Sequence, residues 1–159
     1  MVNLFNGFDF GDKKIRYGNL LSVTYSRSGD MNGNVDSISL DTKKLLITTK
    51  YAVMHSDPLE VKEYSVTDKE VYKLSSMVDK KKLLELSKLP MGDLFAYDAP
   101  TTTLSFTYDN SDIGGSSYDN YSINYYMEFS SSDRKKLKEF TDYLFSLVSE
   151  ERLKRSYKE

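Results

Sequence analysis

The chain has 159 residues, no cysteine, and 22 basic against 24 acidic side chains, for a net charge of −2. The lack of cysteine excludes disulfides and thiolate metal sites, and the near-neutral charge gives little general attraction for nucleic-acid phosphates. Because no window approaches the roughly 20 apolar residues that span a bilayer and the N-terminus lacks a signal-peptide pattern, we expect a soluble, cytoplasmic protein with no membrane partner.

The first predicted element is an N-terminal arm, residues 1–14. It carries Phe5, Phe8 and Phe10 among glycines and polar residues, without a sustained period. We expect these rings to dock on the body of the protein or on a second subunit. The rest of the chain, residues 15–159, contains no internal repeat and is expected to form a single α+β domain.

Four strands are predicted next, because apolar and short polar residues alternate with a period of two. The segments are 19–26, 36–41, 43–51 and 60–67. Their buried face is expected to hold Leu21, Val23, Tyr25, Ile38, Leu40, Leu45, Ile47, Tyr51, Tyr64 and Val66. The opposite face is expected to hold serine and threonine in the first three strands and charged residues in the fourth.

The stretch SGDMNGNVD, residues 28–36, has the alternating oxygen side chains of a calcium loop. Counted from Asp30, however, the sixth position is Val35 and the twelfth is Asp41, where a calcium loop has glycine and glutamate. Asn32-Gly33 between two alternating segments is instead typical of a hairpin, since both residues tolerate positive φ. We therefore predict a turn and no metal site.

Helical periodicity begins at residue 67. Thr67 and Glu70 form the S/T-x-x-E pattern of a capping box, and apolar residues continue at three- and four-residue spacing through Leu74 and Val78. A second short helix is expected around Leu83–Leu86, ended by Pro90.

Alternation returns in residues 101–109 and 121–129, which are joined by a glycine- and serine-rich loop. The second of these strands is expected to turn Tyr121, Ile123, Tyr125, Met127 and Phe129 inward. A final helix is predicted from Ser130–Ser132, with Asp133 favouring its N-terminus and the basic residues Lys154 and Arg155 at its C-terminal end.

The expected order is therefore ββββα(α)ββα, an α+β fold. Alternation in the strands favours a mainly antiparallel sheet of about five or six strands, buried on one face only. Each helix has one apolar stripe, so two or three helices should cover that face in a two-layer sandwich.

No catalytic, cofactor or metal-binding motif is found. His55 could act as a base with Asp57, but no nucleophile is visible beside it, and a histidine metal site needs more than one histidine. Asp98 is expected to cap its turn, and the glycines of residues 112–117 lack the lysine and helix of a phosphate loop.

The sequence instead favours a protein–protein interaction module, such as an inhibitor, an immunity-type protein or an adaptor. Serine and tyrosine together supply adaptable hydrogen bonds and rigid contact area. The expected surface comprises Ser105, Thr107, Tyr118, Tyr121, Ser122, Asn124 and Tyr126. The partner would be another protein, or a second copy bound through the arm or the sheet. The alternative is an enzyme or small-ligand binder with a site assembled from scattered groups such as Asp98, Tyr126 and Glu128.

Overall fold

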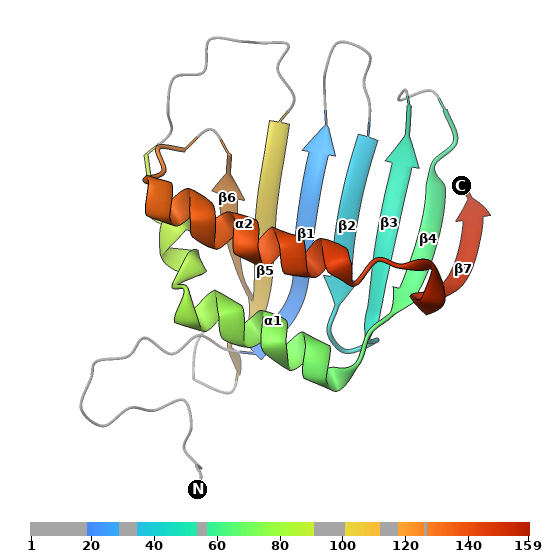
Figure 1. Ribbon diagram of the computed structural model, residues 1–159, viewed down its shortest axis with the longest axis horizontal. Helices are drawn as coiled ribbons and strands as arrows, with labels where there is room; N and C mark the ends of the chain where they lie inside the picture. The colour runs from blue at the N-terminus through green and yellow to red at the C-terminus, as the bar shows by residue number, and fades with distance from the viewer. Residues whose placement is uncertain (1–18, 29–34, 54–56, 91–100, 112–117, 126) are drawn as a thin grey trace, which may run out of the picture.

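The computed structural model describes residues 19–28, 35–53, 57–90, 101–111, 118–125 and 127–159, and the predicted arm 1–14 lies outside them. It confirms the α+β fold, with an antiparallel sheet and helices on one face (Figure 1). The strands are β1 (Asn19–Ser28), β2 (Val35–Asp41), β3 (Leu46–Ala52), β4 (Glu60–Ser65), β5 (Thr101–Asp109), β6 (Tyr118–Asn124) and β7 (Leu153–Lys158). The helices are α1 (Asp68–Lys80) and α2 (Ser131–Ser146), with short 3-10 helices η1 (Leu83–Lys88) and η3 (Glu150–Arg152).

The sheet has seven strands, more than the five or six expected, in the order β6-β5-β1-β2-β3-β4-β7. The extra strand is β7, which we expected to be the basic end of the last helix. That prediction was wrong: α2 ends at Ser146, and the chain turns through η3 before it pairs with the open edge of β4. Basic residues suit a helix C-terminus and a solvent-exposed edge strand equally well, so local sequence did not separate the two.

The two long connections cross the same face of the sheet. The first four strands form a meander, α1 then crosses to β5 on the far side of β1, and α2 returns from β6 to β7 (Figure 1). Both crossovers are right-handed, as twisted strands favour. The 13 residues of α1 span about 20 Å, close to the four strand spacings from β4 to β5. The 16 residues of α2 span about 24 Å, less than the six spacings from β6 to β7, and the chain completes that crossing through η3.

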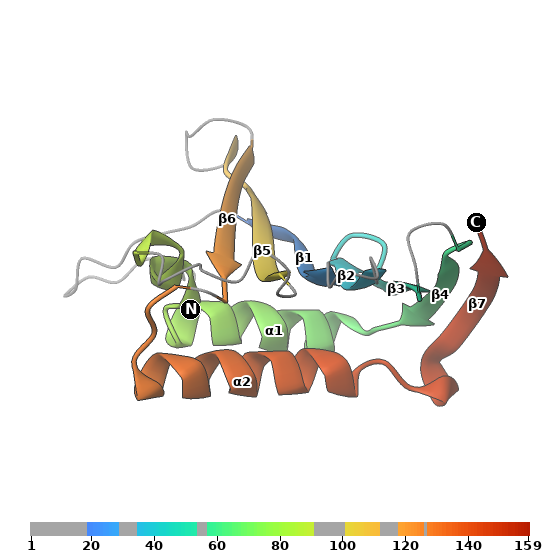
Figure 2. The ribbon, with the colours of Figure 1, turned by 90° about the horizontal axis from the view of Figure 1, so that it is seen from above.

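The core lies between the sheet and the helices (Figure 2). The sheet contributes Val23, Leu40, Ile47, Leu104, Phe106 and Ile123, and the helices contribute Leu74, Val78, Leu83, Leu84, Leu137, Phe140 and Leu144. Phe106 and Phe140 meet edge to face, with ring centroids 5.6 Å apart. Both predicted helix starts are confirmed: the predicted capping box forms at Thr67–Glu70, and the start near Ser130–Ser132 is also a capping box, between Ser130 and Asp133.

Three residues in the first three strands differ from the prediction. A β-bulge between Leu20 and Ser22 buries Leu20 in place of Leu21. Leu45 belongs to the turn before β3, with φ of 55°. Tyr51 has the parity of Ile47 but is 49% exposed, because it pairs beyond the part of the sheet that the helices cover.

The strand predicted over residues 121–129 is displaced. It begins earlier, at Tyr118, and ends at Asn124, after which a turn at Tyr125 leads toward α2. Tyr125, Met127 and Phe129 still pack against the core, so their inward direction was predicted correctly and their secondary structure was not.

Candidate functional site

The sheet face opposite the helices, here called the outer face, carries a row of hydroxyl side chains. Strand register places Ser122, Ser105, Thr24, Ser39 and Thr48 next to one another across five strands. Thr24 Oγ1 and Ser39 Oγ are 3.1 Å apart, as are Ser105 Oγ and Ser122 Oγ. We call these five residues the hydroxyl row. Cross-strand hydroxyl pairs of this kind contribute to sheet stability while leaving further hydrogen-bonding capacity.

A second polar row runs beside the first. Asn120, Thr107, Ser22 and Asp41 are neighbours in register, and Thr107 Oγ1 donates to Asn120 Oδ1 at 2.7 Å. Both rows follow from the period of two, which sends every second residue of each strand to this face.

The predicted surface residues divide between the two faces. By register, Ser105, Thr107, Tyr118, Ser122 and Asn124 share the outer face, and Tyr118 is 61% exposed. Tyr121 lies on the helix face, half-buried, with its ring 5.9 Å from that of Tyr108 in an edge contact. Tyr126 lies outside the described residues.

Toward β4 and β7, the outer face carries charged and apolar side chains beside the polar ones. The hydroxyl row continues past Thr48 to Glu63 and Arg155, whose guanidinium lies 4.5 Å from the ring centroid of Tyr157. Val61, beside Tyr157 in register, is fully buried on this face. Sequence alternation had indicated only charged residues here, because an isolated valine among Glu60, Lys62 and Glu63 carries no periodic signal.

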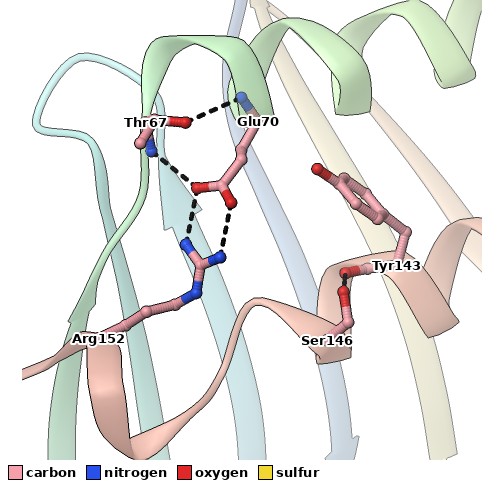
Figure 3. Close-up of polar contacts among 5 residues, drawn as sticks. All are labelled: Thr67, Glu70, Tyr143, Ser146 and Arg152. Atoms are coloured by element: carbon pink, nitrogen blue, oxygen red, sulfur yellow. Dashed lines mark hydrogen bonds and ion pairs between the residues drawn. The ribbon is translucent and has the colours of Figure 1, made fainter.

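A polar cluster on the helix side of the sheet ties η3 to the start of α1 (Figure 3). Arg152 donates two hydrogen bonds to Glu70, Nη1 to Oε1 at 2.7 Å and Nη2 to Oε2 at 2.6 Å. Glu70 Oε1 also accepts from the Thr67 amide at 2.9 Å. The Arg152 guanidinium is the main cause that lowers the pKa of Glu70 from 4.5 to about 2. Such a carboxylate is ionised and fully engaged at neutral pH, so its role is structural rather than that of a general base.

Tyr143 lies close to this pair on α2. Burial, and then the nearby negative charge of Glu70, raise the pKa of its phenol. The Lys73 ammonium lies 4.2 Å from the centroid of the Tyr143 ring. Ser146 Oγ donates a hydrogen bond to the Tyr143 carbonyl at 2.6 Å (Figure 3). A protonated phenol with a cation over its face is a packing element between α1 and α2.

A third group of side chains joins β1 to the region of α2. The Tyr25 ring meets Phe145 at 5.0 Å and Tyr125 at 6.1 Å, both in edge contacts. Burial raises the pKa of both phenols, and the Tyr125 hydroxyl finds no hydrogen-bond partner among the residues that the structure describes. Edge-to-face packing of aromatic rings accounts for this arrangement without invoking chemistry.

Of the three residues expected for a scattered catalytic site, the structure describes only Glu128. Glu128 is exposed and its amide donates to the Pro90 carbonyl at 3.0 Å, whereas Asp98 and Tyr126, like His55 and the loop 112–117, lie outside the described residues. Across the described ranges, no three acidic, histidine or cysteine side chains gather as metal ligands would. Within those same ranges, no helix has the length and apolar character needed to span a membrane.

No protein-family model matches this chain, and comparison with curated proteins finds no significant similarity. Any functional conclusion therefore depends on the geometry of the molecule itself.

Proposed function

We propose that this protein is a protein–protein interaction module, such as an inhibitor, an immunity-type protein or an adaptor, that binds through its outer face. The observation that carries the proposal is the hydroxyl row, five short hydroxyl side chains adjacent across five strands, with both helices on the opposite side (Figure 2). Each hydroxyl can donate and accept, so the row can adapt to a partner's polar groups.

The composition of this face suits recognition. Its centre at Thr24 and Ser39 is uncharged, so burying this part of the face against a partner requires no desolvation of charged groups. At the β6 end, the exposed ring of Tyr118 adds an aromatic residue of the type that dominates binding energy in many interfaces. Specificity would then come from hydrogen-bond pattern and shape rather than from charge.

The partner class follows from the same features. A net charge of −2 and an uncharged centre of the outer face favour a protein partner, or a second copy of the chain, over a nucleic acid. The absence of cysteine fits a reducing compartment, and we propose the cytoplasm. Cell fractionation that recovers the protein with cytoplasmic markers would support this placement, and recovery with membranes or secreted material would contradict it.

The test is quantitative affinity capture from cells of the source organism, with the wild-type protein, Ser39→Arg and Tyr72→Arg as the three baits. Ser39→Arg adds one large cation at the middle of the hydroxyl row and is expected to reduce capture of a specific partner at least tenfold. Tyr72→Arg adds the same charge at a residue of α1 that is 74% exposed, and is expected to leave capture unchanged. Equal capture by all three baits, once each is shown to be folded, would contradict the assignment of the outer face.

A further inference from the structure

The two edges of the sheet differ in what lies beside them. At one edge, η1 packs against β6. At the other edge β7 is the last strand, and no described element lies beyond it (Figure 1 and Figure 2). Four of the six residues of β7 are exposed to solvent. The β7 edge is therefore the one that a partner can reach.

The hydrogen bonds between β4 and β7 show which main-chain groups of β7 face outward. The Glu159 amide donates to the Leu59 carbonyl at 2.9 Å, so these two residues form a hydrogen-bonded pair. Hydrogen-bonded and non-hydrogen-bonded pairs alternate in an antiparallel ladder, so Tyr157 also bonds to β4. The amides and carbonyls of Ser156 and Lys158 therefore point away from β4. An extended peptide lying alongside can pair with these donors and acceptors.

Basic side chains flank these main-chain groups on both faces of the sheet. β7 carries Lys154, Arg155 and Lys158, and all three are exposed. Because successive side chains of a strand alternate, Arg155 lies on the outer face and Lys158 on the helix face. None of the three forms an ion pair with another residue in the described ranges. The edge is therefore lined by cations that are available to a ligand.

The acidic residues nearby do not neutralise these cations. A carboxylate oxygen of Glu60 lies 3.8 Å from the Lys62 ammonium, and one of Glu159 lies 3.8 Å from a lysine of β3. Glu63 is opposite Arg155 in register, but no ion pair joins these two described residues. Two of the three carboxylates are thus shared with lysines of β3 and β4, and the charge of β7 remains positive.

We propose that β7 binds an extended acidic segment of a partner protein, which adds to the seven-stranded sheet as a further strand. The main chain of that segment pairs with the outward groups of Ser156 and Lys158. Its carboxylates meet Arg155 on one face and Lys158 on the other. Strand addition of this kind obtains affinity from main-chain hydrogen bonds and specificity from alternate side chains.

Charge selects this occupant over a second copy of the chain. Two β7 strands side by side would place three cations of one copy against the same three of the other, and like charges opposite one another are unfavourable. Lysine on an edge strand discourages such association. A strand rich in carboxylates is attracted instead, so the same residues exclude wrong partners and favour an acidic one.

The main chain selects a peptide over a nucleic acid. Phosphate oxygens can accept hydrogen bonds from the outward amides of Ser156 and Lys158, but an ionised phosphate has no proton to donate to their carbonyls. A peptide strand offers both an amide and a carbonyl at each non-proline residue. Only a peptide therefore satisfies both kinds of group along this edge.

This inference goes beyond the proposed function, because it adds a second binding surface beside the outer face. The two can fail separately. Ser39 lies on β2, three strands from β7, so Ser39→Arg is expected to leave the binding of an acidic peptide unchanged. Normal capture of a partner by the outer face, with no acidic peptide bound at β7, would overturn the edge assignment alone.

The first experiment selects ligands from a displayed library of random linear peptides of about 12 residues, long enough for one strand. Peptides that bind Ser156→Pro are removed beforehand. This variant loses an outward amide at an edge position that tolerates proline, and circular dichroism would show that it is folded. Peptides then retained by the wild type are expected to be rich in aspartate, glutamate and β-branched residues. No retained peptide, or retained peptides without an acidic excess, would overturn the proposal.

A matched pair of variants tests the charge. A retained peptide is expected to bind the wild type with a dissociation constant on the order of 10 µM, because a single added strand buries a small area. Lys158→Glu reverses one charge at the edge and is expected to raise that constant about tenfold. Lys69→Glu makes the same change at an exposed position of α1 and is expected to leave it unchanged. Equal binding by the two variants would contradict the role of the basic edge.

The last measurement separates strand addition from attraction between charges alone. Methylation of every second peptide nitrogen blocks hydrogen bonds along one edge of the peptide and leaves its charge intact. Only alternate residues of a strand bond to a given neighbour, so methylation of one alternate set is expected to weaken binding at least tenfold and methylation of the other set to have little effect. Equal binding of the two methylated peptides, or equally tight binding of single-stranded DNA of the same charge, would overturn strand addition.

Discussion

The two faces of the sheet differ in how far they are buried, although the same strands form both. On the helix face, Val23, Leu40 and Ile47 are fully buried, because α1 and α2 cover them. On the outer face, the neighbouring Thr24, Ser39 and Thr48 keep partial exposure and hydrogen-bond one another or remain available. Burial of apolar area supplies most of the folding free energy, so stability should depend on the first face and recognition on the second.

The largest expected effect is at the helix face. Phe140 is fully buried and its ring packs on Phe106. Phe140→Ala removes this ring and leaves a cavity, so we expect a loss of about 3–5 kcal/mol in the free energy of unfolding. Urea unfolding followed by circular dichroism would measure it. A loss below about 1 kcal/mol would mean that α2 does not depend on this contact.

A smaller effect is expected where α1 is tied to the end of the chain. Glu70→Gln keeps a side chain that can complete the capping box but removes the charge that pairs with Arg152. We expect a loss of about 1–2 kcal/mol at pH 7, because the pair is partly exposed and solvent weakens it. Thermal and urea unfolding of the two proteins would give the difference.

The same pair predicts a pH dependence. The folded pKa of Glu70 is about 2, below its ordinary 4.5, so the ionised carboxylate stabilises the protein fully above about pH 4.5 and loses that effect as the pH falls toward 2. The difference between wild type and Glu70→Gln should therefore shrink between pH 5 and about pH 2. Comparing the two proteins at each pH cancels the titration of every other carboxylate. A difference that is constant over this range would contradict the assigned pKa.

The smallest effect is expected on the outer face. Thr24→Val replaces one hydroxyl of the hydroxyl row by a methyl group of similar shape, and Ser39 can exchange its lost partner for water. We expect a change within about 0.5 kcal/mol in stability, since surface substitutions rarely do more. Partner capture should nevertheless fall. Strong destabilisation by Thr24→Val would remove the distinction between a stabilising face and a binding face.

The sequence predicted what depends on local pattern. Alternation in residues 19–26 and 101–109 placed serine and threonine on one face because successive side chains in a strand point to opposite sides, whatever the neighbours are. Thr67 with Glu70, and Ser130 with Asp133, located both helix starts because a cap needs only residues close in sequence. The predicted surface residues Ser105, Thr107 and Ser122 shared a face for the same reason.

Only the tertiary structure decided what depends on pairing between distant segments. It turned residues Leu153–Lys158 into an edge strand because β4 had an open side, and it buried Val61 on the outer face beside Tyr157. It also set Tyr51 beyond the cover of the helices, and brought Arg152 to Glu70 across 82 positions of sequence. These outcomes follow from which strand lies beside which, and a single sequence read locally carries no direct signal of that order.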